Sequence, residues 1–565
     1  MEIRRRDIPD LDLPADIHPL LRRLYAARQV KDAAELDYAL QQLIPPTALA
    51  NIDAAATLLE RHLDQRILIV GDFDADGATS SALGILGLKA LGATHVDYLV
   101  PDRFTYGYGL TPEIVGLARE RQPDLIITVD NGISSIAGVA AAKAAGIRVL
   151  VTDHHLAGAE LPDADVIVNP NQPGCDFPSK SLAGVGVMFY VLLALRAQLR
   201  ENGMDDAPNL ASLLDLVALG TVADVVPLDA NNRRLVHHGL LRIRGNACRP
   251  GIRALLEVAG RTQASVTATD LGFAVGPRLN AAGRLEDMSI GIECLLADDY
   301  SRALALARQL DELNRARRDI EAGMQEEALR AIDDIHLDGN ELPLALCLHD
   351  THWHQGVVGL VASRIKERYH RPVIAFAPEE GGETLKGSAR SVPGVHMRDV
   401  LDAVATRHPG LVTKFGGHAM AAGLSLPAAR LGDFEQALND EIARWVDADA
   451  LRGVLQSDGE LEPDWLSLDA AELLRDGGPW GQGFPEPQFD GEFEIVTRRI
   501  VGEKHLKLRL RVPGDGRQLD AIAFNEDGAE LPPGEGRVRA VYRLDVNEFR
   551  GMRSAQLVIE HIEAA

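Results

Sequence analysis

The chain has few cysteines and no long apolar runs. Its four cysteines among 565 residues form no CxxC pair, so neither a disulfide framework nor a zinc ribbon is predicted. No run approaches the ~18 apolar residues that span a bilayer. The charged start of the chain lacks the apolar core of a secretory signal. We therefore expect no membrane segment and a cytoplasmic protein.

Basic residues are also scarce. The 58 Lys and Arg against 83 Asp and Glu give a formal net charge of −25. Taken alone, this balance argues against a nucleic-acid partner. The argument is weak, because bound metal would neutralise part of the acid excess and a local basic groove can still hold a polyanion. The net charge therefore does not decide whether the protein binds a nucleic acid.

Short apolar runs alternate with Ala- and Gly-rich helical stretches in the first half of the chain. The runs occupy residues 67–70, 96–100, 125–129, 149–151 and 166–168. This alternation predicts an α/β domain with a parallel sheet covered by helices on both faces. Several runs are followed by acidic clusters, which we expect at the carboxyl edge of the sheet, where open parallel sheets bind their ligands.

Aspartates and histidines gather at that expected edge. The acidic residues that follow apolar segments are Asp72, Asp74, Asp76, Asp130, Asp153 and Asp224, and the pair His154 and His155 adjoins them. Carboxylates this close repel one another, so a divalent cation is the simplest reason for them to coexist. Oxygen ligands with one or two imidazoles favour Mn²⁺ or Mg²⁺ over zinc. Each aspartate has an alternative role as a helix cap, and for Asp72 both interpretations stay open.

The rest of the chain divides into further regions. Residues 1–60 predict an N-terminal helical cap, and residues 61–297 hold the parallel sheet. Residues 298–336 form an unbroken helical pattern without proline, typical of a long connecting helix. Residues 337–450 predict a second, smaller α/β domain. Residues 451–565 predict a small β-barrel, in which strict alternation leaves Lys507, Arg509 and Arg511 on one strand face.

Eight ordered motifs resemble the RecJ family of exonucleases, within the DHH phosphoesterase superfamily. They are Gly71-Asp-Phe-Asp-Ala-Asp-Gly77, the segments 101–110 and 129–132, Thr152-Asp-His-His155, the segments 221–224, 276–284 and 387–391, and Phe415-Gly-Gly-His-Ala-Met-Ala-Ala-Gly423. The resemblance covers nearly the whole chain. It implies a DHH domain, a connecting helix, a DHH-associated domain and a C-terminal OB-fold.

The resemblance also implies roles for the acidic edge. Metal ligands are implied at Asp74, Asp76, Asp130, His154 and Asp224. Asp130 is the candidate bridge between two cations, His155 would lie beside the scissile phosphate, and Asp153 would orient a histidine. Two cations about 4 Å apart would activate a water and clamp the phosphodiester during an in-line displacement. Asp72 is left outside the implied ligand set.

Polar residues of the other motifs are candidates for holding DNA. The implied substrate-binding residues are Arg103, Tyr108, Arg278, Asn280, Arg284, Ser388, Arg390, Ser391 and His418. Most of the arginines and serines suit bidentate binding of a terminal 5′-phosphate, although an interdomain salt bridge is an open alternative for each arginine. His418 lies in a glycine-rich segment that suits phosphate binding or tight packing. Tyr108 would either stack a base or belong to the core.

The implied activity is a metal-dependent single-strand-specific 5′→3′ exonuclease acting in DNA recombination and repair. The resemblance adds a single-strand binding protein and a DNA helicase as partners, and we expect a monomer. Two alternatives stay open: a phosphoesterase for short oligonucleotides or cyclic dinucleotides, and a non-catalytic single-strand-binding scaffold. The N-terminal cap and the barrel argue against a small substrate, and the complete ligand set argues against a silent scaffold.

Val70 leads to a first prediction about metal affinity. Small-molecule DHH phosphatases have a histidine four residues before the first of the paired aspartates, and here Val70 holds that position. One metal position therefore has fewer protein ligands, and we expect it to bind more weakly until substrate phosphate completes it. Calorimetric titration with Mn²⁺ in the absence of DNA should give unequal sites. Two equally tight sites would contradict the expectation.

Overall fold

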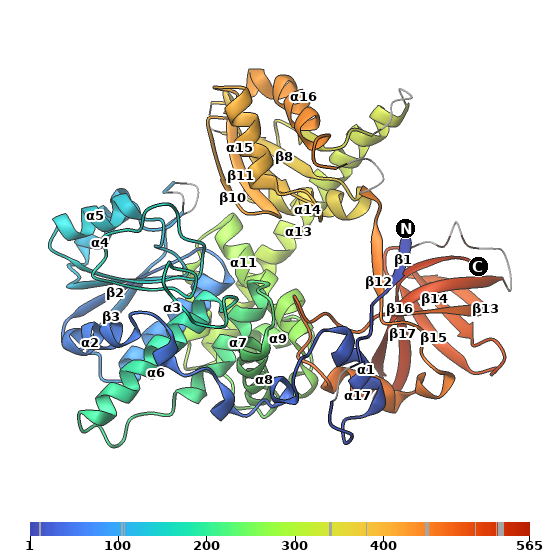
Figure 1. The fold of residues 1–565 in the computed structure, drawn as a ribbon, viewed down its shortest axis with the longest axis horizontal. Helices are drawn as coiled ribbons and strands as arrows, with labels where there is room; N and C mark the ends of the chain where they lie inside the picture. The colour runs from blue at the N-terminus through green and yellow to red at the C-terminus, as the bar shows by residue number, and fades with distance from the viewer. Residues whose placement is uncertain are drawn as a thin grey trace. The chain divides into compact units, whose positions relative to one another are not determined.

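A computed structural model describes residues 1–10, 13–102, 105, 106, 108–337, 342–379, 381–446, 451–502, 504–526, 528, 531 and 536–565 (Figure 1). Contacts between residues divide the chain into two compact units. One unit comprises residues 1–4 and 313–455, and the other comprises residues 5–312 and 456–565. No helix among the described residues has the length and apolar composition needed to cross a membrane.

The larger unit contains a parallel five-stranded sheet in the order β3-β2-β4-β5-β6. Its strands are β2 (Arg66–Gly71), β3 (His95–Leu99), β4 (Leu125–Val129), β5 (Arg148–Thr152) and β6 (Val166–Val168). Every residue of β4 is buried, as expected for a central strand covered on both faces. The predicted parallel α/β domain is confirmed.

Helices cover both faces of this sheet. Helices α4 (Pro112–Glu120) and α5 (Ile136–Ala144) pack on one face, and α2 (Ile52–His62), α3 (Ala75–Ala90) and α6 (Gly184–Glu201) lie on the other (Figure 1). Small residues allow α3 to pack closely against α6, since a Cβ on Gly87 would lie 2.3 Å from the side chain of Leu192 on α6. The first turn of α3 packs equally closely on the residues that follow β2, since a Cβ on Gly77 would lie 2.4 Å from the Asp72 carbonyl oxygen.

A helical region follows the sheet. It contains α7 (Leu214–Ala223), α8 (Ala230–Arg244), α9 (Pro250–Val258), α10 (Ala268–Asp270), a π-helical turn (Leu271–Val275), α11 (Gly276–Leu285), α12 (Ser289–Leu296) and α13 (Tyr300–Leu337). Helix α7 packs against α3 and ends immediately before Asp224. Helix α13 runs unbroken for 38 residues, in agreement with the predicted long helix.

The smaller unit contains a five-stranded mixed sheet in the order β10-β11-β9-β8-β7. Its strands are β7 (Leu346–His349), β8 (Val373–Pro378), β9 (Thr384–Arg390), β10 (Lys414–Gly417) and β11 (Ala421–Pro427), with helices α14 (Val358–Tyr369), α15 (Met397–Arg407) and α16 (Leu431–Ile442). Only β7 and β8 are parallel. Phe376 and Phe434 meet edge to face in its core. The smaller α/β domain is confirmed.

The C-terminal strands close into a barrel in the order β13-β14-β15-β17-β16. The strands are β13 (Phe489–Val501), β14 (His505–Arg511), β15 (Gln518–Ala523), β16 (Arg537–Phe549) and β17 (Met552–Ala564), preceded by α17 (Leu468–Asp476). Of these pairs, only β15 with β17 is parallel. The OB-fold is confirmed. In β14 the leucines point inward, while acidic neighbours such as Asp520 pair with the outward basic side chains.

The N-terminal segment is fixed to the residues that lead into the barrel. Strand β1 (Glu2–Arg5) pairs with β12 (Val454–Ser457), and α1 (Pro19–Ala27) places Tyr25 against the stacked rings of Trp480 and Phe484. Arg28 and Asp458 form an ion pair at 2.9 Å in which both side chains are only 1% exposed. Removing one partner of such a buried ion pair strongly destabilises the fold, because the other charge stays buried without a counter-charge.

We therefore expect the substitution Asp458→Ala to lower the free energy of unfolding by about 3–5 kcal/mol, because it leaves the Arg28 guanidinium buried and unpaired. Denaturant unfolding measures this change. The matched control is Asp464→Ala, which removes a 92% exposed partner of Arg517 and should change stability by less than about 1 kcal/mol. Equal effects of the two substitutions would contradict the prediction.

Candidate active site

The predicted acidic cluster assembles at the carboxyl edge of the parallel sheet. Asp72, Asp74 and Asp76 follow β2, Asp130 follows β4, and the segment 153–155 follows β5. Asp224 reaches the same place from the end of α7, although it lies far along the chain from β5. The structure therefore brings together side chains from four separate segments.

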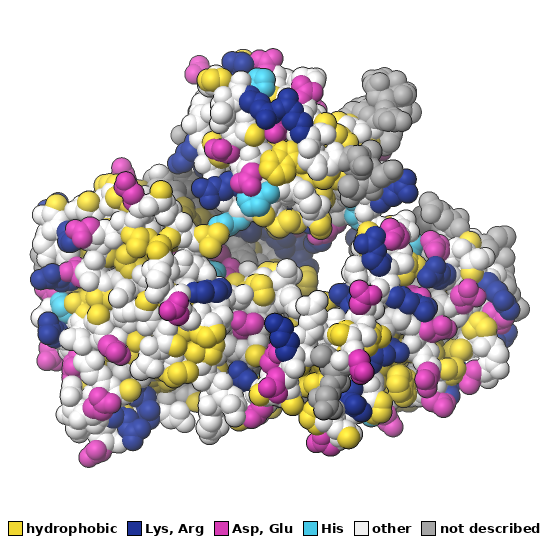
Figure 2. Space-filling model, viewed as in Figure 1, with side chains coloured by type: hydrophobic (Ala, Val, Ile, Leu, Met, Phe, Trp, Pro, Cys, Tyr) yellow, Lys and Arg dark blue, Asp and Glu magenta, His cyan; other side chains and the backbone are white. Residues whose placement is uncertain are grey.

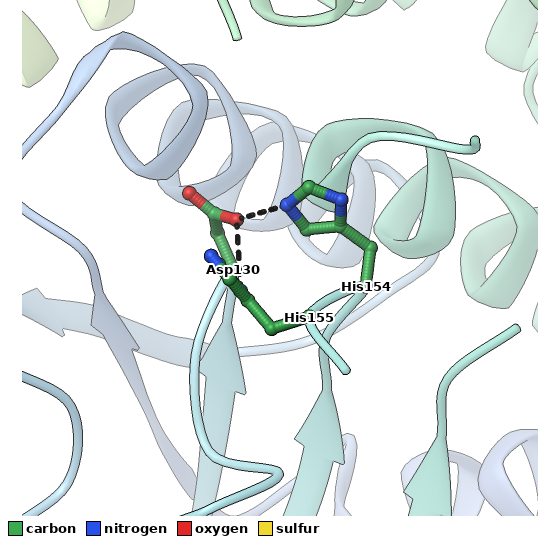
Figure 3. A group of neighbouring side chains, drawn as sticks. All are labelled: Asp130, His154 and His155. Carbon is green, nitrogen blue, oxygen red and sulfur yellow. Dashed lines mark ion pairs between the residues drawn. The ribbon is translucent and has the colours of Figure 1, made fainter. Parts of the chain in front are cut away.

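The imidazole of His154 lies within this cluster. Its Nε2 atom is 3.0 Å from Asp130 Oδ1 (Figure 3), 3.5 Å from Asp224 Oδ2 and 4.0 Å from Asp76 Oδ2. Three groups have ligand atoms that all lie within 4.8 Å of one another: Asp130 with His154 and His155, Asp76 with His154 and Asp224, and Asp72 with Asp74 and Asp130. Overlapping groups of this kind suit more than one cation.

Asp76 is fully buried and is held by the first turn of α6. Its carboxylate accepts hydrogen bonds from the backbone N–H of Gly184 at 2.7 Å and of Val185 at 2.9 Å. Burial and the adjacent Asp74 carboxylate nevertheless raise the pKa of Asp76 to about 7. The helix N-terminus thus orients Asp76 but does not supply enough positive charge to offset its neighbours.

Asp130 and Asp224 experience the same repulsion. Burial, followed by the charges of Asp76 and Asp74, raises the pKa of each well above the usual range for aspartate. Asp224 Oδ2 is buried and accepts no hydrogen bond from any described residue. Buried carboxylate oxygens that repel one another are the donor set that a divalent cation would stabilise. The residues present therefore fit a Mn²⁺ or Mg²⁺ site.

Asp153 and His155 form an oriented pair beside the cluster. Asp153 Oδ1 accepts hydrogen bonds from His155 Nδ1 at 2.8 Å and from two backbone N–H groups, and Oδ2 accepts one from Ile133. Burial alone would raise the pKa of Asp153, but these bonds and the charge of His155 hold it below its usual range. Burial alone would lower the pKa of His155, but Asp153 and the charges of Asp72 and Asp74 together outweigh that effect and raise the pKa to about 9.

Two other predicted residues lie in the same place. The hydroxyl of Tyr108 is 3.2 Å from His155 Nδ1 and also donates to the Asp130 carbonyl. Asn280 Oδ1 accepts the N–H of Ala75 at 2.7 Å, so it supports the turn that carries Asp74 and Asp76. Helix α11 also presses on this turn, since a Cβ on Gly283 would lie 1.8 Å from the Phe73 carbonyl oxygen.

The remaining predicted substrate residues lie elsewhere or are already engaged. Arg278 pairs with Asp311 at 2.8 Å and is nearly buried, and Arg284 is half-buried in the last turn of α11. In the smaller unit, Arg390 donates to Ser388, Ser391 donates to Val395, and His418 is exposed. Arg103 lies outside the described residues. Their roles with substrate stay predictions.

Two features of the site go beyond the ligand set that the family resemblance implies. Asp72 is buried beside Asp74 and Asp130, although the family resemblance leaves it outside the ligand set. Gly184 at the start of α6 lies so close to Asp130 that an added Cβ would be 2.7 Å from the Asp130 Cβ atom. The signal for Gly184 was present as Gly184-Val-Gly186 at the head of an apolar helix.

Comparison with known proteins first defines the class. Family models match the DHH family N-terminal domain at residues 66–221, the DHHA1 domain at 343–444 and the RecJ OB domain at 457–561. The sheet-edge aspartates and the Asp-His-His triplet are thus those of a DHH protein.

Individual relatives then define the family. The single-stranded-DNA-specific exonuclease RecJ of Dickeya dadantii (strain 3937) is 56% identical over 569 residues, which cover 99% of both chains. A crystal structure of RecJ in complex with Mn²⁺ from Thermus thermophilus matches with a TM-score of 0.80 and 31% identity, over 97% of this chain and 76% of that one. The corresponding Mg²⁺ complex matches with a TM-score of 0.74 and 30% identity, over 97% and 75%. The chain belongs to the RecJ family.

Gly184 provides a test of how tightly the cluster is packed. The substitution Gly184→Ala places a methyl group 2.8 Å from Asp130 Oδ1, so we expect the carboxylate to move and the affinity for Mn²⁺ to fall at least about tenfold. Calorimetric titration measures the affinity. The control Gly116→Ala adds a methyl group in open space on α4 and should leave metal binding unchanged. Unaltered affinity in Gly184→Ala would show that the site is not this closely packed.

The raised carboxyl pKa values predict how stability depends on pH and metal. Between the ordinary value of 3.8 and about 7, folded Asp76 binds more protons than unfolded Asp76, so the metal-free protein loses stability as pH rises through that window. A bound cation removes this penalty. We therefore expect Mn²⁺ to raise the melting temperature more at pH ~7.5 than at pH ~5, relative to protein in EDTA. An equal rise at both pH values would contradict the electrostatic account.

Proposed function

We propose that this chain is a metal-dependent exonuclease that hydrolyses single-stranded DNA from its 5′ end and releases 5′-mononucleotides. The observation that carries the proposal is the overlapping cluster of buried aspartates around His154 at the edge of a DHH sheet. Membership of the RecJ family supports the substrate, since the relative from Dickeya dadantii is named a single-stranded-DNA-specific exonuclease.

The cofactor in this proposal is Mn²⁺ or Mg²⁺, with two ions in each active site and one of them bound more weakly. The proposed ligands are Asp74, Asp76, Asp130, His154 and Asp224, with Asp130 bridging. Crystal structures of the Thermus thermophilus relative with Mn²⁺ and with Mg²⁺ support this choice. When bound, the ions supply Lewis acidity toward the phosphodiester and the attacking water.

His155 provides positive charge beside the reacting phosphate. Burial lowers the pKa of His155, but Asp153 and the charges of Asp72 and Asp74 raise it to about 9 in the metal-free protein. Asp153 holds Nδ1 and so fixes the orientation of the ring, whose two nitrogens lie 3.2 Å and 3.3 Å from the Tyr108 hydroxyl. A fixed imidazolium in a partly buried site stabilises negative charge that develops on a phosphoryl oxygen. Asp153 is therefore a positioning residue for His155.

Other polar residues would bind the strand. Arg390 has no ion pair with a described residue, and burial alone lowers its pKa, so its guanidinium suits a phosphate ligand. Ser388 accepts a hydrogen bond from Arg390, and both pack against Gly359 in the first turn of α14. The proposed substrate-binding set is Arg103, Tyr108, Arg278, Asn280, Arg284, Ser388, Arg390, Ser391 and His418.

The same proposal covers domain limits and cellular context. We assign residues 1–60 to an N-terminal cap, 61–297 to the DHH domain, 298–336 to the connecting helix, 337–450 to the DHH-associated domain and 451–565 to the OB-fold. The matched ranges 66–221, 343–444 and 457–561 fall inside these limits and support them.

We further propose a cytoplasmic monomer that works with a DNA helicase and a single-strand binding protein during recombination and repair.

A substrate panel separates this proposal from its alternatives. The panel comprises 5′-labelled and 3′-labelled single strands, duplex DNA and a dinucleotide, each with Mn²⁺, Mg²⁺ or EDTA. An exonuclease of the proposed type releases labelled mononucleotide at once from the 5′ label and late from the 3′ label, and spares duplex. Cleavage of the dinucleotide alone would favour a small-substrate phosphoesterase. Binding without cleavage would favour a scaffold.

The substitution Asp130→Ala tests the chemistry within the site. We expect it to abolish cleavage while DNA affinity stays largely intact, because Asp130 is the proposed bridging ligand and the strand is held mainly by other residues. Initial rates on labelled single strands and anisotropy with the same strands measure the two effects. The control Asp163→Ala removes a 90% exposed carboxylate and should leave both unchanged. Cleavage retained by Asp130→Ala in Mn²⁺ buffer would refute the role.

A further inference from the structure

Val225 has a backbone conformation that is unusual for its residue type. Its φ is +62°, in the left-handed region, where a β-branched side chain is an outlier. The residue lies just beyond the end of α7, and its N–H donates to the Val222 carbonyl at 3.2 Å. Glycine is the residue most often found in this conformation after a helix, because it has no Cβ. The conformation of Val225 therefore carries a steric cost that glycine would avoid.

Burial of the side chain does not offset this cost, since Val225 is 63% exposed. Exposed apolar side chains are scattered over the molecule in the view of Figure 2, so exposure alone would not single out Val225. Exposure together with the strained backbone does, because a side chain held at a steric cost and left in water contributes little to folding. Strained residues of this kind cluster at functional sites.

The chain is fixed on both sides of Val225. Before it, a Cβ on Gly276 would lie 3.0 Å from Ala223, so α11 packs closely on the end of α7. After it, Leu228 is buried, and its N–H donates to the Gln482 carbonyl at 2.7 Å. A strained conformation persists where the surrounding structure holds it in this way. The exposed side chain of Val225 is therefore presented from a rigid position.

That position adjoins the proposed metal ligands. Val225 directly follows Asp224, whose Oδ2 atom is 3.5 Å from His154 Nε2. Leu156 follows His154 by two residues on the other side of this contact and is 58% exposed. Two exposed aliphatic side chains thus come from the segments that carry these ligands. Aliphatic groups offer nothing to a phosphate or a cation, so they suit the apolar parts of a bound nucleotide.

The sugar is the part of the nucleotide that an aliphatic side chain suits best. Bases stack on aromatic rings in single-strand sites, and Phe73 and Tyr108 supply two rings at this site, with centroids 6.1 Å apart. The C2′ atom of deoxyribose carries only hydrogens, whereas ribose has a hydroxyl there, by which proteins distinguish RNA from DNA. The methyl groups of Val225 cannot hydrogen-bond to that hydroxyl, so burying it against them is unfavourable.

We propose that Val225 is a specificity-determining residue that packs against the sugar beside the scissile bond and selects deoxyribose over ribose. The inference rests on the proposed function for the reaction. It explains the strained backbone, because glycine would relieve the strain but leave no side chain against C2′. The selectivity is bounded, since an apolar pocket rejects an added hydroxyl by only about a hundredfold. A contact with the base would instead give a preference among bases and none between sugars.

The test compares sugars at the two nucleotides that flank the scissile bond. Oligonucleotides of one sequence carry deoxyribose, ribose or 2′-fluoro-2′-deoxyribose there, and kcat/KM is measured for the full-length chain in Mn²⁺ buffer. We expect a preference for deoxyribose over ribose of about tenfold to a hundredfold, with the 2′-fluoro strand close to deoxyribose because fluorine needs no hydrogen bond. A 2′-fluoro strand as poor as the ribose strand would overturn the apolar contact.

Val225→Thr keeps the branched shape and the backbone conformation but adds a hydroxyl that can pair with the 2′-hydroxyl. We expect it to lower the preference for deoxyribose to about threefold or less. The matched control is Val454→Thr at an exposed valine of β12, which should leave the preference unchanged. Equal preferences in the wild-type chain and Val225→Thr would contradict the assignment.

Val225→Gly separates specificity from folding. Removing the side chain relieves the left-handed strain, so we expect the melting temperature to stay the same or rise while the preference for deoxyribose falls. A lower melting temperature with an unchanged preference would show that the side chain serves the fold and would overturn the proposal.

Binding separates this proposal from the proposed function. Anisotropy of the same strands, labelled with fluorescein and with Ca²⁺ in place of Mn²⁺, measures the sugar preference without cleavage. A preference for deoxyribose in binding that Val225→Thr removes would support the assignment, even in a chain that cleaves neither strand and so refutes the exonuclease. Cleavage of DNA with a sugar preference that neither Val225 variant alters would support the exonuclease and refute the role of Val225.

Discussion

Mutual repulsion among buried carboxylates is the constraint on which the larger unit depends. Asp76 and Asp130 are buried and Asp224 is partly buried, and burial together with the charges of this cluster raises the pKa of each carboxyl. A fold that holds them together must supply rigid support or positive charge. The parallel sheet supplies rigidity, because strand ends cannot separate without breaking buried ladders, and the N-terminus of α6 supplies two hydrogen bonds to Asp76. Divalent cations supply the remaining charge.

Much of this arrangement was predictable from the sequence, for a physical reason. Parallel strands buried on both faces leave continuous apolar runs, and the carboxyl ends of such strands meet at one edge. Asp74, Asp130 and His154 each follow a run of this kind, so their proximity followed from local pattern. The barrel was equally predictable, because the leucines of β14 alternate with its basic residues and only one set faces the core.

Other parts of the site had no local signal. Asp224 follows an apolar segment as the other acids do, but that segment is a helix and not a strand, so the rule for sheet edges does not apply to it. Its position depends on the packing of α7 against α3. Arg278 looked suited to a phosphate, yet it pairs with Asp311 on another helix, and sequence pattern cannot reveal such a partner.

The backbone of Asp130 has a consequence for how this site can change. Its φ of +60° lies in the left-handed region, which side chains other than glycine, asparagine and aspartate rarely adopt. Glycine would relieve the strain and remove the ligand, while longer acids would add both strain and bulk against Gly184. Asparagine alone fits the backbone and the space, but it carries no charge. The position is thus constrained both by its backbone conformation and by the need for a negative charge. Few single mutations at this position can preserve the conformation and the charge together.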